Sequence, residues 1–337
     1  MAADFRSDNV LGCSPEIAEA IMRESKRSTT SYGGDDVTAR VRERCSELFE
    51  TEVDIFPVVT GTAGNALSLS ALTPPNGAVL CHEDAHIQRD ECGATELLSG
   101  GAKLITIAGA DGKLHPESLR NARGSALSIT NLTEAGTVYT PNEIRALHEA
   151  IGDLGMNVGL HVDGARFANA VVATGASPAD LTWRSGVDLL TFGATKNGAL
   201  AAELIVVFRR DLTQDLALRH HRSGHRVAKM RFITAQFEAY LIGDLWLRNA
   251  RHANAMGAYL SRGLADAGIE IVRPTHANVV FARLGPELAA KLRAEGFQFF
   301  DWFLFGPGVY RLVTGFNTPQ ESVDAFVAAC VPTPRPL

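Results

Sequence analysis

The sequence predicts an α/β fold: a mostly parallel mixed sheet with helices on both faces, followed by a small C-terminal α+β domain. Two observations favour it. Short apolar runs alternate with helical patterns up to Phe208, and after Arg222 the pattern changes to a long helix and a few short strands. The length of 337 residues fits one large domain plus a smaller one. We expect residues 1–245 to form the large domain and residues 246–337 the small one.

Apolar runs of four or five residues predict the strands of the large sheet. They span residues 55–59, 78–81, 104–107, 126–129, 158–162, 187–191 and 204–208. Helical stretches lie between several of them, and this alternation is typical of parallel strands joined by helical crossovers. Because sites in open parallel sheets lie at the carboxyl ends of strands, polar residues that follow these runs are the first candidates for a functional site.

Helices of the large domain are predicted over residues 15–26, 36–49, 62–72 and 141–154. The first and the last have clear start signals. Ser14 precedes Pro15 and Thr140 precedes Pro141, which places a capping hydroxyl before a proline at the first helical position.

The C-terminal part opens with a helical pattern over residues 227–264, in which apolar residues recur at three- and four-residue spacing. Short runs at 269–272, 279–282 and 310–313 predict strands, with a helix over 285–294 between the last two. This part also holds an aromatic cluster: Phe299, Phe300, Trp302, Phe303 and Phe305. We expect the cluster to be core of the small domain; the alternative is a pocket wall for an aromatic side chain.

Charge and cysteine content narrow the class of protein. With 32 basic and 38 acidic residues the net charge is −6, and no basic block is present, so nucleic acid and anionic membranes are poor candidate partners. No apolar run is long enough to span a bilayer, and no signal-peptide core follows the N-terminus. The five cysteines are scattered and form no CxxC pair. We therefore expect reduced thiols in a cytoplasmic protein, with no disulfide and no metal site.

Two polar residues follow neighbouring apolar runs and together indicate a cofactor. Asp163 ends the run His161–Val162–Asp163, and Lys196 lies in a small-residue loop directly after the run at 187–191. Pyridoxal 5'-phosphate needs a lysine amine for its Schiff base and an acid that pairs with its pyridinium nitrogen. A surface lysine and a helix-capping aspartate are the structural alternatives.

A third segment fits the phosphate of the same cofactor. Gly61, Thr62 and Gly64 follow a predicted strand and open a predicted helix. Free backbone N–H groups at a helix N-terminus bind phosphate well, and Thr62 adds a hydroxyl group. The alternative is a tight turn with a threonine cap.

Seven short motifs in order give the chain a family resemblance. They are Phe5-Arg6-Ser7-Asp8-Asn9-Val10, Ser31-Tyr32-Gly33-Gly34-Asp35-Asp36-Val37-Thr38, Thr60-Gly61-Thr62-Ala63-Gly64-Asn65, Ala85-His86, His161 to Ala170, the Lys196 loop, and Arg311-Leu312-Val313-Thr314. The chain resembles the threonine aldolase family of fold-type-I pyridoxal-phosphate enzymes, which are related to the β-eliminating lyases. The resemblance extends from Phe5 to about Thr314.

The resemblance implies roles for residues that would otherwise be read as surface groups. By similarity, His86 stacks on the pyridine ring, and Arg166 contacts the phenolic oxygen of the cofactor and the substrate carboxylate. Arg231 resembles a family arginine that helps to hold the phosphate.

Further positions are implied to bind substrate. Ser7 and Arg311 lie in the segments that clamp the substrate carboxylate in the family, a task that suits a planar guanidinium because it can bind both oxygens. Tyr32 and Asp35 lie in the motif that closes the family site near a subunit boundary. A strand-end arginine and a glycine-rich surface turn are the respective alternatives.

One position departs from the family pattern. Many threonine aldolases carry a second active-site histidine after the fourth strand, whereas this chain has Glu134 there. A carboxylate can accept a proton or order a water, but it adds negative charge near the β-hydroxyl group of the substrate. The candidate base is therefore His86, Glu134 or a water between them.

The resemblance implies cleavage of an L-β-hydroxy-α-amino acid, such as threonine, allo-threonine or phenylserine, to glycine and an aldehyde. β-Elimination and transamination remain alternatives, because they share the lysine–aspartate pair. A catalytically silent binding module is a further alternative. The resemblance further implies a homodimer or homotetramer with active sites shared between subunits.

Overall fold

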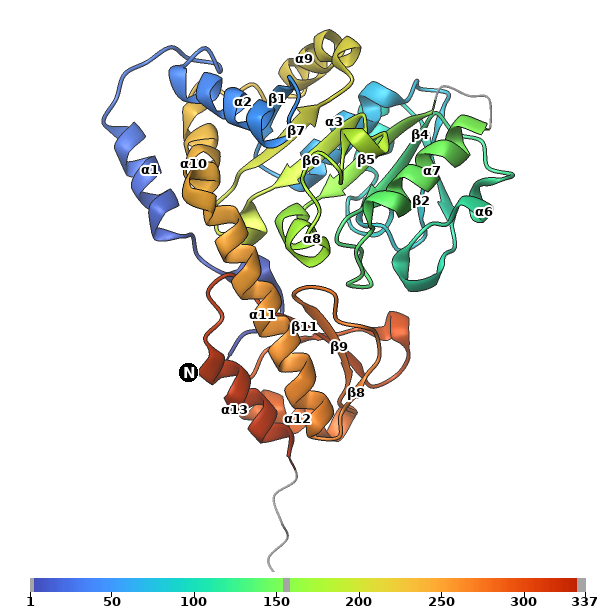
Figure 1. Cartoon of the computed structure of the whole chain (residues 1–337), viewed down its shortest axis with the longest axis vertical. Coiled ribbons are helices and arrows are strands. Elements are labelled where there is room, and N and C mark those ends of the chain that lie inside the picture. Colours follow the sequence, from blue (N-terminus) through green and yellow to red (C-terminus); the bar gives the residue numbers. More distant parts are fainter. Residues whose placement is uncertain (1–2, 154–157, 332–337) are drawn as a thin grey trace, which may run out of the picture.

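The computed structural model describes residues 3–153 and 158–331 and confirms the predicted α/β architecture. In this part of the chain, seven strands form the large sheet in the order β1-β7-β6-β5-β4-β2-β3, and β7 alone runs against its neighbours (Figure 1). The strands are β1 (Asp54–Val58), β2 (Ala78–His82), β3 (Lys103–Ile107), β4 (Ala126–Thr130), β5 (Gly159–Gly164), β6 (Leu189–Gly193) and β7 (Glu203–Val207). Each predicted apolar run coincides with one of them to within two residues at either end.

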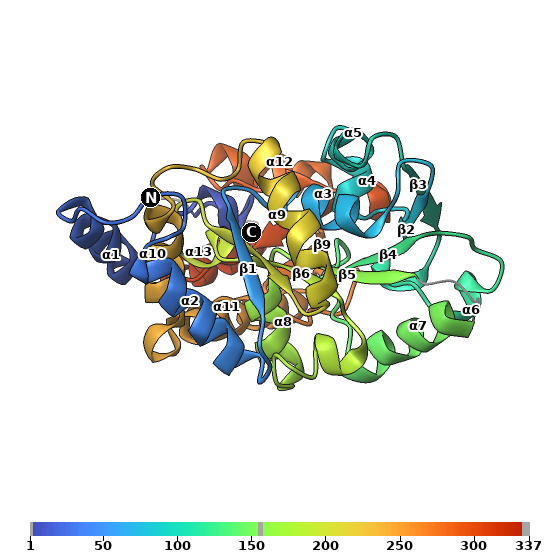
Figure 2. The same ribbon diagram turned by 90° about the horizontal axis from the view of Figure 1, so that it is seen from above.

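Helices cover both faces of this sheet, as the alternating pattern predicts (Figure 2). Buried residues on one face form a single core with α1 (Pro15–Ser25), α2 (Asp36–Leu48), α6 (Pro116–Leu119), α7 (Pro141–Asp153), α8 (Phe167–Thr174) and α10 (Arg231–Leu241). The other face carries α3 (Gly61–Leu72), α4 (His86–Arg89), α5 (Ala94–Ser99) and α9 (Thr213–Arg222). The sheet is thus buried between two helical layers, and its strand ends are left for a site.

The two predicted helix caps differ in outcome. Thr140 forms a full capping box at α7, since Glu143 N donates to Thr140 Oγ1 and Thr140 N donates to Glu143 Oε2. The side-chain cap predicted for Ser14 was wrong, because Ser14 Oγ accepts a hydrogen bond from Asn249 of α11 (Leu245–Asp266) at 2.9 Å instead. The end of the predicted helix 141–154 lies outside the described residues.

The long helix predicted over residues 227–264 was also wrong in one respect. The structure divides it into α10 and α11, with a turn at Gly243 and Asp244 between them. Both turn residues have positive φ, +59° and +55°, which ends the α-helical hydrogen-bond ladder. The chain then continues in α11 toward the small domain (Figure 1).

The small domain contains a four-stranded antiparallel sheet of described residues in the order β10-β11-β9-β8. Its elements are β8 (Glu270–Ile271), β9 (Val279–Arg283), α12 (Pro286–Ala294), β10 (Phe300–Asp301), β11 (Val309–Val313) and α13 (Gln320–Cys330). The N-terminal segment completes its core, because Phe5 is fully buried and packs edge-on against Phe326 at a centroid distance of 5.2 Å. Among the described helices, none is long and apolar enough to cross a membrane.

Candidate active site

A cavity of about 250 Å³ opens at the carboxyl ends of the parallel strands. It is lined by the loops that follow β1, β4, β5 and β6, and by the first residue of the antiparallel strand β7. Seven of the sequence-predicted site residues line it: Gly61, Thr62, His86, Glu134, Asp163, Arg166 and Lys196. The parallel topology explains this convergence, because the carboxyl ends of adjacent strands meet at one edge.

Lys196 and Asp163 reach the cavity from neighbouring strands. Lys196 lies in the 3-10 turn Thr195–Asn197 that follows β6, and Asp163 lies near the end of β5 with 3% of its surface exposed. Asp163 does not cap the next helix: Arg166 holds the N-cap position of α8, and Asp163 Oδ1 accepts a hydrogen bond from the N–H of Ala165 at 3.0 Å. The Asp163 carboxylate is thus fixed at the cavity wall.

A chain of hydrogen bonds joins Asp163 to His86. Asn65 Nδ2 donates to Asp163 Oδ2 and to Glu91 Oε1, both at 2.9 Å, and Glu91 Oε1 also lies 2.9 Å from His86 Nδ1. The hydrogen bond to Glu91, together with the negative charges of Asp163 and Glu134, raises the pKa of His86 although burial opposes it. The network fixes the imidazole of His86 at the start of α4 and favours its protonated form.

His86, Glu91 and Asp163 are of residue types that bind metal ions. The candidate ligand atoms of His86, Glu91 and Asp163 lie within 4.8 Å of one another. However, the Asn65 amide places a donor between the two carboxylates and satisfies an oxygen of each, so the group is held together without an ion. The predicted absence of a metal stays a prediction.

Behind Asp163, a buried polar ladder crosses three strands. His161 has no exposed surface; its Nδ1 lies 3.0 Å from Ser128 Oγ and its Nε2 lies 3.1 Å from Thr191 Oγ1. Burial lowers the pKa of His161 to about 4, so the ring is neutral near pH 7. The ladder fixes the strand that carries Asp163 to both neighbours.

The predicted phosphate turn is the N-terminus of α3. The cap is Thr60, whose Oγ1 accepts from the N–H of Ala63 at 3.1 Å, and this leaves Gly61 and Thr62 at the cavity with their backbone N–H groups unused by the cap. A Cβ atom on Gly64 would lie 2.6 Å from Thr191 Cγ2. Glycine at this position therefore lets the helix start approach β6 and the cavity closely.

Arg166 is held by a partner that the sequence did not identify. Its Nε and Nη2 donate to the two Asp8 oxygens at 2.7 and 2.9 Å, and Asn278 Nδ2 donates to Asp8 Oδ2 at 3.1 Å. Asp8 is 3% exposed and Arg166 is 8% exposed. Burial alone would raise the pKa of Asp8, but the charge and hydrogen bonds of Arg166 hold it below its ordinary value. The pair joins the N-terminal segment to the large domain.

Glu134 and Arg311 are close to the cavity and to each other in electrostatic terms. Glu134 lines the cavity from the loop after β4. Arg311, on β11, lies over the Trp302 ring with its Cζ 4.6 Å from the ring centroid, and its buried Nε has no hydrogen-bond partner among the described residues. Burial and the neighbouring positive charge of Arg166 lower the pKa of Arg311, whereas the Glu134 charge opposes the change.

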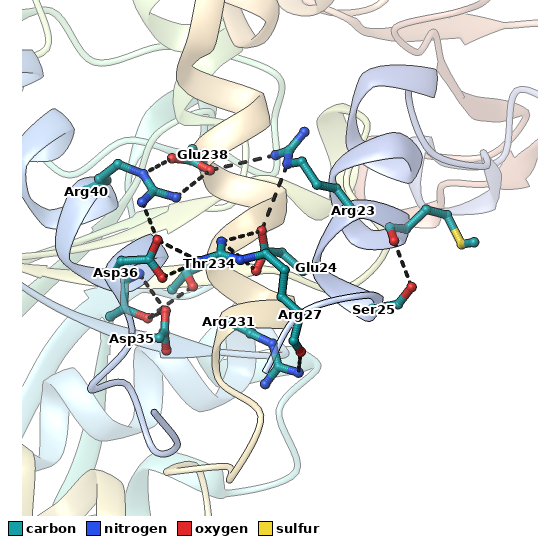
Figure 3. A network of polar contacts seen from close by, with 12 residues as sticks. Arg23, Glu24, Ser25, Arg27, Asp35, Asp36, Arg40, Arg231, Thr234 and Glu238 are labelled. Atoms are coloured by element: carbon teal, nitrogen blue, oxygen red, sulfur yellow. Dashed lines mark hydrogen bonds and ion pairs between the residues drawn. The ribbon is translucent and has the colours of Figure 1, made fainter. Parts of the chain in front are cut away.

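Five predicted residues, Arg311 and four others, lie outside the cavity lining of the described chain. Ser7 caps a short 3-10 turn, accepting from the N–H of Asn9 at 3.2 Å. Tyr32 is 50% exposed in the loop before α2, and Asp35 caps α2 by accepting from the N–H of Thr38 at 2.8 Å. Arg231 begins α10 and donates to the backbone oxygen of Arg27 at 3.2 Å (Figure 3). Their roles in binding stay predictions.

The aromatic cluster is core only in part. Phe299 is 3% exposed, and Trp302 and Phe305 are partly buried. Phe300 and Phe303 are 44% and 80% exposed, so the prediction was wrong for these two. Phe299 packs edge-on against Tyr310 and Phe326, while Trp302 and Phe305 pack on Phe281. None of the five cluster residues, all of them described, lines the cavity. The alternative of an aromatic pocket wall therefore has no support in the single chain.

Three cavity-lining residues, Asn65, Glu91 and Glu203, were missed by the sequence reasoning as site residues. Asn65 lies within a helix, Glu91 within a polar turn, and Glu203 at the start of an apolar run, so none follows a strand as the predicted residues do. The available signal for Glu203 was a lone carboxylate at the edge of a buried strand.

Comparison with known proteins identifies the family of the chain. The sequence model of the beta-eliminating lyase family matches residues 4–285. A low specificity L-threonine aldolase of a Pseudomonas species is 38% identical over 335 residues and covers 96% of both chains, and that of Pseudomonas aeruginosa is 39% identical over 330 residues, covering 95% of this chain and 94% of its own.

Solved structures agree with these relatives. A threonine aldolase from Leishmania major superposes with a TM-score of 0.89 at 27% identity, covering 97% of this chain and 98% of that chain. An aspartate aminotransferase from Thermus thermophilus has a TM-score of 0.70 at 17% identity, covering 97% of this chain and 90% of its own, which shows the shared fold alone.

Proposed function

The chain belongs to the beta-eliminating lyase family, together with the low specificity threonine aldolases, and we propose that it cleaves L-threonine and related β-hydroxy-α-amino acids to glycine and an aldehyde, using pyridoxal 5'-phosphate. The observation that carries this proposal is the convergence of Lys196, Asp163 and His86 on one cavity beside the free N-terminus of α3.

The cavity residues fit the cofactor. Asp163 offers a fixed carboxylate to a pyridinium nitrogen, and the start of α3 offers N–H groups to a phosphate. Three buried atoms of cavity-lining residues have no partner among the described residues: Asn65 Oδ1, Glu91 Oε2 and Glu203 Oε2. Such atoms are costly unless a ligand or water satisfies them, and this supports a polar occupant.

Each residue has a proposed task. When bound, the cofactor supplies an electron sink for the bond between Cα and Cβ of the amino acid. Lys196 supplies the amine that holds the cofactor aldehyde, and Asp163 keeps the ring nitrogen protonated. His86, held by Glu91, would stack on the ring. Glu134 accepts the β-hydroxyl proton directly or through a water that it shares with His86.

The substrate carboxylate needs a cation. Arg166 already carries a bidentate carboxylate, Asp8. Arg311 and Arg231 each have a buried Nε without a partner among the described residues, and of the two Arg311 is under the influence of the charges of Glu134 and Arg166, which line the cavity. We assign the substrate carboxylate to Arg311, with Ser7 and the remaining N–H groups of Arg166 in support. Arg231, Tyr32 and Asp35 do not line the cavity of the single chain, and we assign them to a site completed by a second copy in a homodimer or homotetramer.

The test is an assay of purified protein with pyridoxal phosphate and threonine, allo-threonine or phenylserine, with glycine and aldehyde measured together. We expect equal amounts of both products, together with an absorbance band near 420 nm and a Lys196 peptide labelled by borohydride. Release of ammonia and a 2-oxo acid with the full carbon skeleton of the substrate, without glycine, would favour β-elimination instead. A colourless protein with no labelled lysine would contradict any enzymatic role of this cavity.

A further inference from the structure

Glu203 is a buried carboxylate that the proposed reaction does not use. It begins β7, where it pairs with Val58 of β1 on one side and with Gly193 of β6 on the other. It is 5% exposed and lines the cavity, and its Oε2 is buried with no hydrogen-bond partner among the described residues. An unpaired buried carboxylate oxygen is costly, so the group calls for a functional explanation.

The position of Glu203 places it between two proposed cofactor contacts. Its β1 partner, Val58, lies two residues before Thr60, the cap of α3, and its β6 partner lies three residues before Lys196. The turn of Thr195 and Lys196 is tied back to this point of β7, since Ala202 N donates to Thr195 Oγ1 at 3.2 Å. Glu203 thus shares one wall of the cavity with the helix start that is suited to phosphate.

The charges around the cavity make an ionised Glu203 unfavourable for an anionic ligand. Glu91, Glu134 and Asp163 also line it, while the charge of Arg166 is already matched by Asp8. The titratable groups that face Glu203 are Lys196 on the turn after β6, Asp163 on β5 and Tyr240 on α10. Of these three groups, Lys196 is the cation that favours the ionised form of Glu203, and it is the group that the cofactor aldehyde would engage.

We propose that Glu203 must be protonated for the cavity to hold the phosphate-bearing end of the cofactor, so that binding takes up one proton at this carboxyl. As a neutral acid, Glu203 donates a hydrogen bond from the oxygen that now has no partner; as a carboxylate, it would repel the phosphate. The proposal rests on the proposed function, because it takes the cavity to be the pyridoxal-phosphate site.

The structure gives the size of the effect. Burial raises the pKa of Glu203 to about 7, although hydrogen bonding from Thr195 and the charge of Lys196 oppose the shift. Apparent affinity scales with the fraction of protein in the competent form. That fraction falls from about one half at pH 7 to about one hundredth at pH 9, so the apparent Kd should rise about fifty-fold across this range.

The experiment measures binding of pyridoxine 5'-phosphate, which lacks the aldehyde and so leaves the Lys196 amine out of the chemistry. Calorimetric titrations of the full chain at pH 7 and pH 9, each in two buffers of different ionisation enthalpy, give the affinity and the proton uptake. The variants are Glu203→Gln, which keeps a donor without a charge, and Glu203→Asp, which keeps the acid. Glu96→Gln is the matched control, since Glu96 Oε2 is also buried without a partner among the described residues but lies outside the cavity lining.

We expect the wild-type protein and Glu96→Gln to lose affinity about fifty-fold from pH 7 to pH 9, and Glu203→Gln to lose much less and to take up about one proton fewer at pH 9. Glu203→Asp should keep the pH dependence. The inference is overturned if Glu203→Gln has the wild-type pH profile, or if it binds more weakly than wild type at both pH values while melting at the same temperature. Failure of wild-type protein to bind pyridoxal phosphate at all would instead contradict the proposed function.

Discussion

Replacement of Asp8 by asparagine should strongly destabilise the protein, because Asp8 is the charged partner of a buried arginine. Asp8 accepts hydrogen bonds from Arg166 at 2.7 and 2.9 Å and from Asn278 at 3.1 Å, and both it and Arg166 are more than nine-tenths buried. The variant Asp8→Asn keeps the shape of the side chain but leaves the Arg166 charge unmatched. Breaking a buried pair in this way costs about 3–5 kcal/mol of unfolding free energy.

The assay is urea-induced unfolding of the cofactor-free protein at pH 7, followed by circular dichroism and tryptophan fluorescence. Asp4→Asn is the matched control on the same segment. Asp4 pairs with Arg6 at 2.6 Å, but the side chains are 30% and 42% exposed, so this pair should contribute less than about 1 kcal/mol. Equal losses for the two variants, or a loss below about 1 kcal/mol for Asp8→Asn, would refute the reasoning.

The same pair predicts a pH dependence. The folded-state pKa of Asp8 lies below the ordinary pKa of an aspartate, so its contribution to stability is present above that ordinary value and is lost as the pH falls through the folded-state pKa. The stability difference between wild type and Asp8→Asn should therefore shrink in acid below about pH 4. A difference that stays constant down to pH 2 would mean that the charge of Asp8 is not what stabilises the fold.

Three further predictions follow from the site and the fold. Glu134→Gln should lower kcat by about 10²- to 10⁴-fold, while the absorbance of the bound cofactor stays unchanged. An unchanged kcat would indicate that His86 is the base. Glu91→Gln should lower the pKa of His86 toward its ordinary value, as followed by NMR titration of the histidine ring with His86→Asn for assignment; an unmoved titration would show that Glu91 does not control it. Thr140→Ala removes the capping box of α7 and should lower the free energy of unfolding in urea by about 1 kcal/mol. Thr174→Ala, at the C-terminal end of α8, should lower it by less.

The sheet and the wall of the cavity were predictable because both depend on local patterns. An apolar run of strand length is buried on both faces in a parallel sheet, and a polar residue directly after it must lie at the sheet edge. Lys196 and Asp163 were found in this way, whereas Arg166 was assigned by the family resemblance. The turn at Gly243 and Asp244 was missed because the apolar spacing continues across it, and only the backbone conformation interrupts the helix.

The polar partners could not be predicted, since they come from distant parts of the chain. Asp8 meets Arg166 across 158 positions, and Asn65 meets Asp163 across 98. Nothing in the spacing of either residue specifies its partner; the pairing depends on how the small domain and the helix layers dock onto the sheet. Ser14 shows the same limit. It holds the N-cap position of α1, but its hydroxyl group bonds to Asn249, which is distant in the sequence.

The packing of Phe5 against Phe326 has a consequence for the order of events during synthesis. Residues from the start of the chain complete a core whose other members, such as Leu312 and Phe326, are made more than 300 positions later. The first segment must therefore remain unpaired on the ribosome while the large sheet forms, since domains fold as their residues emerge. Phe5 therefore reaches its place in this core only after the small domain has been made, whereas Asp8, three residues later, meets Arg166 of the large domain.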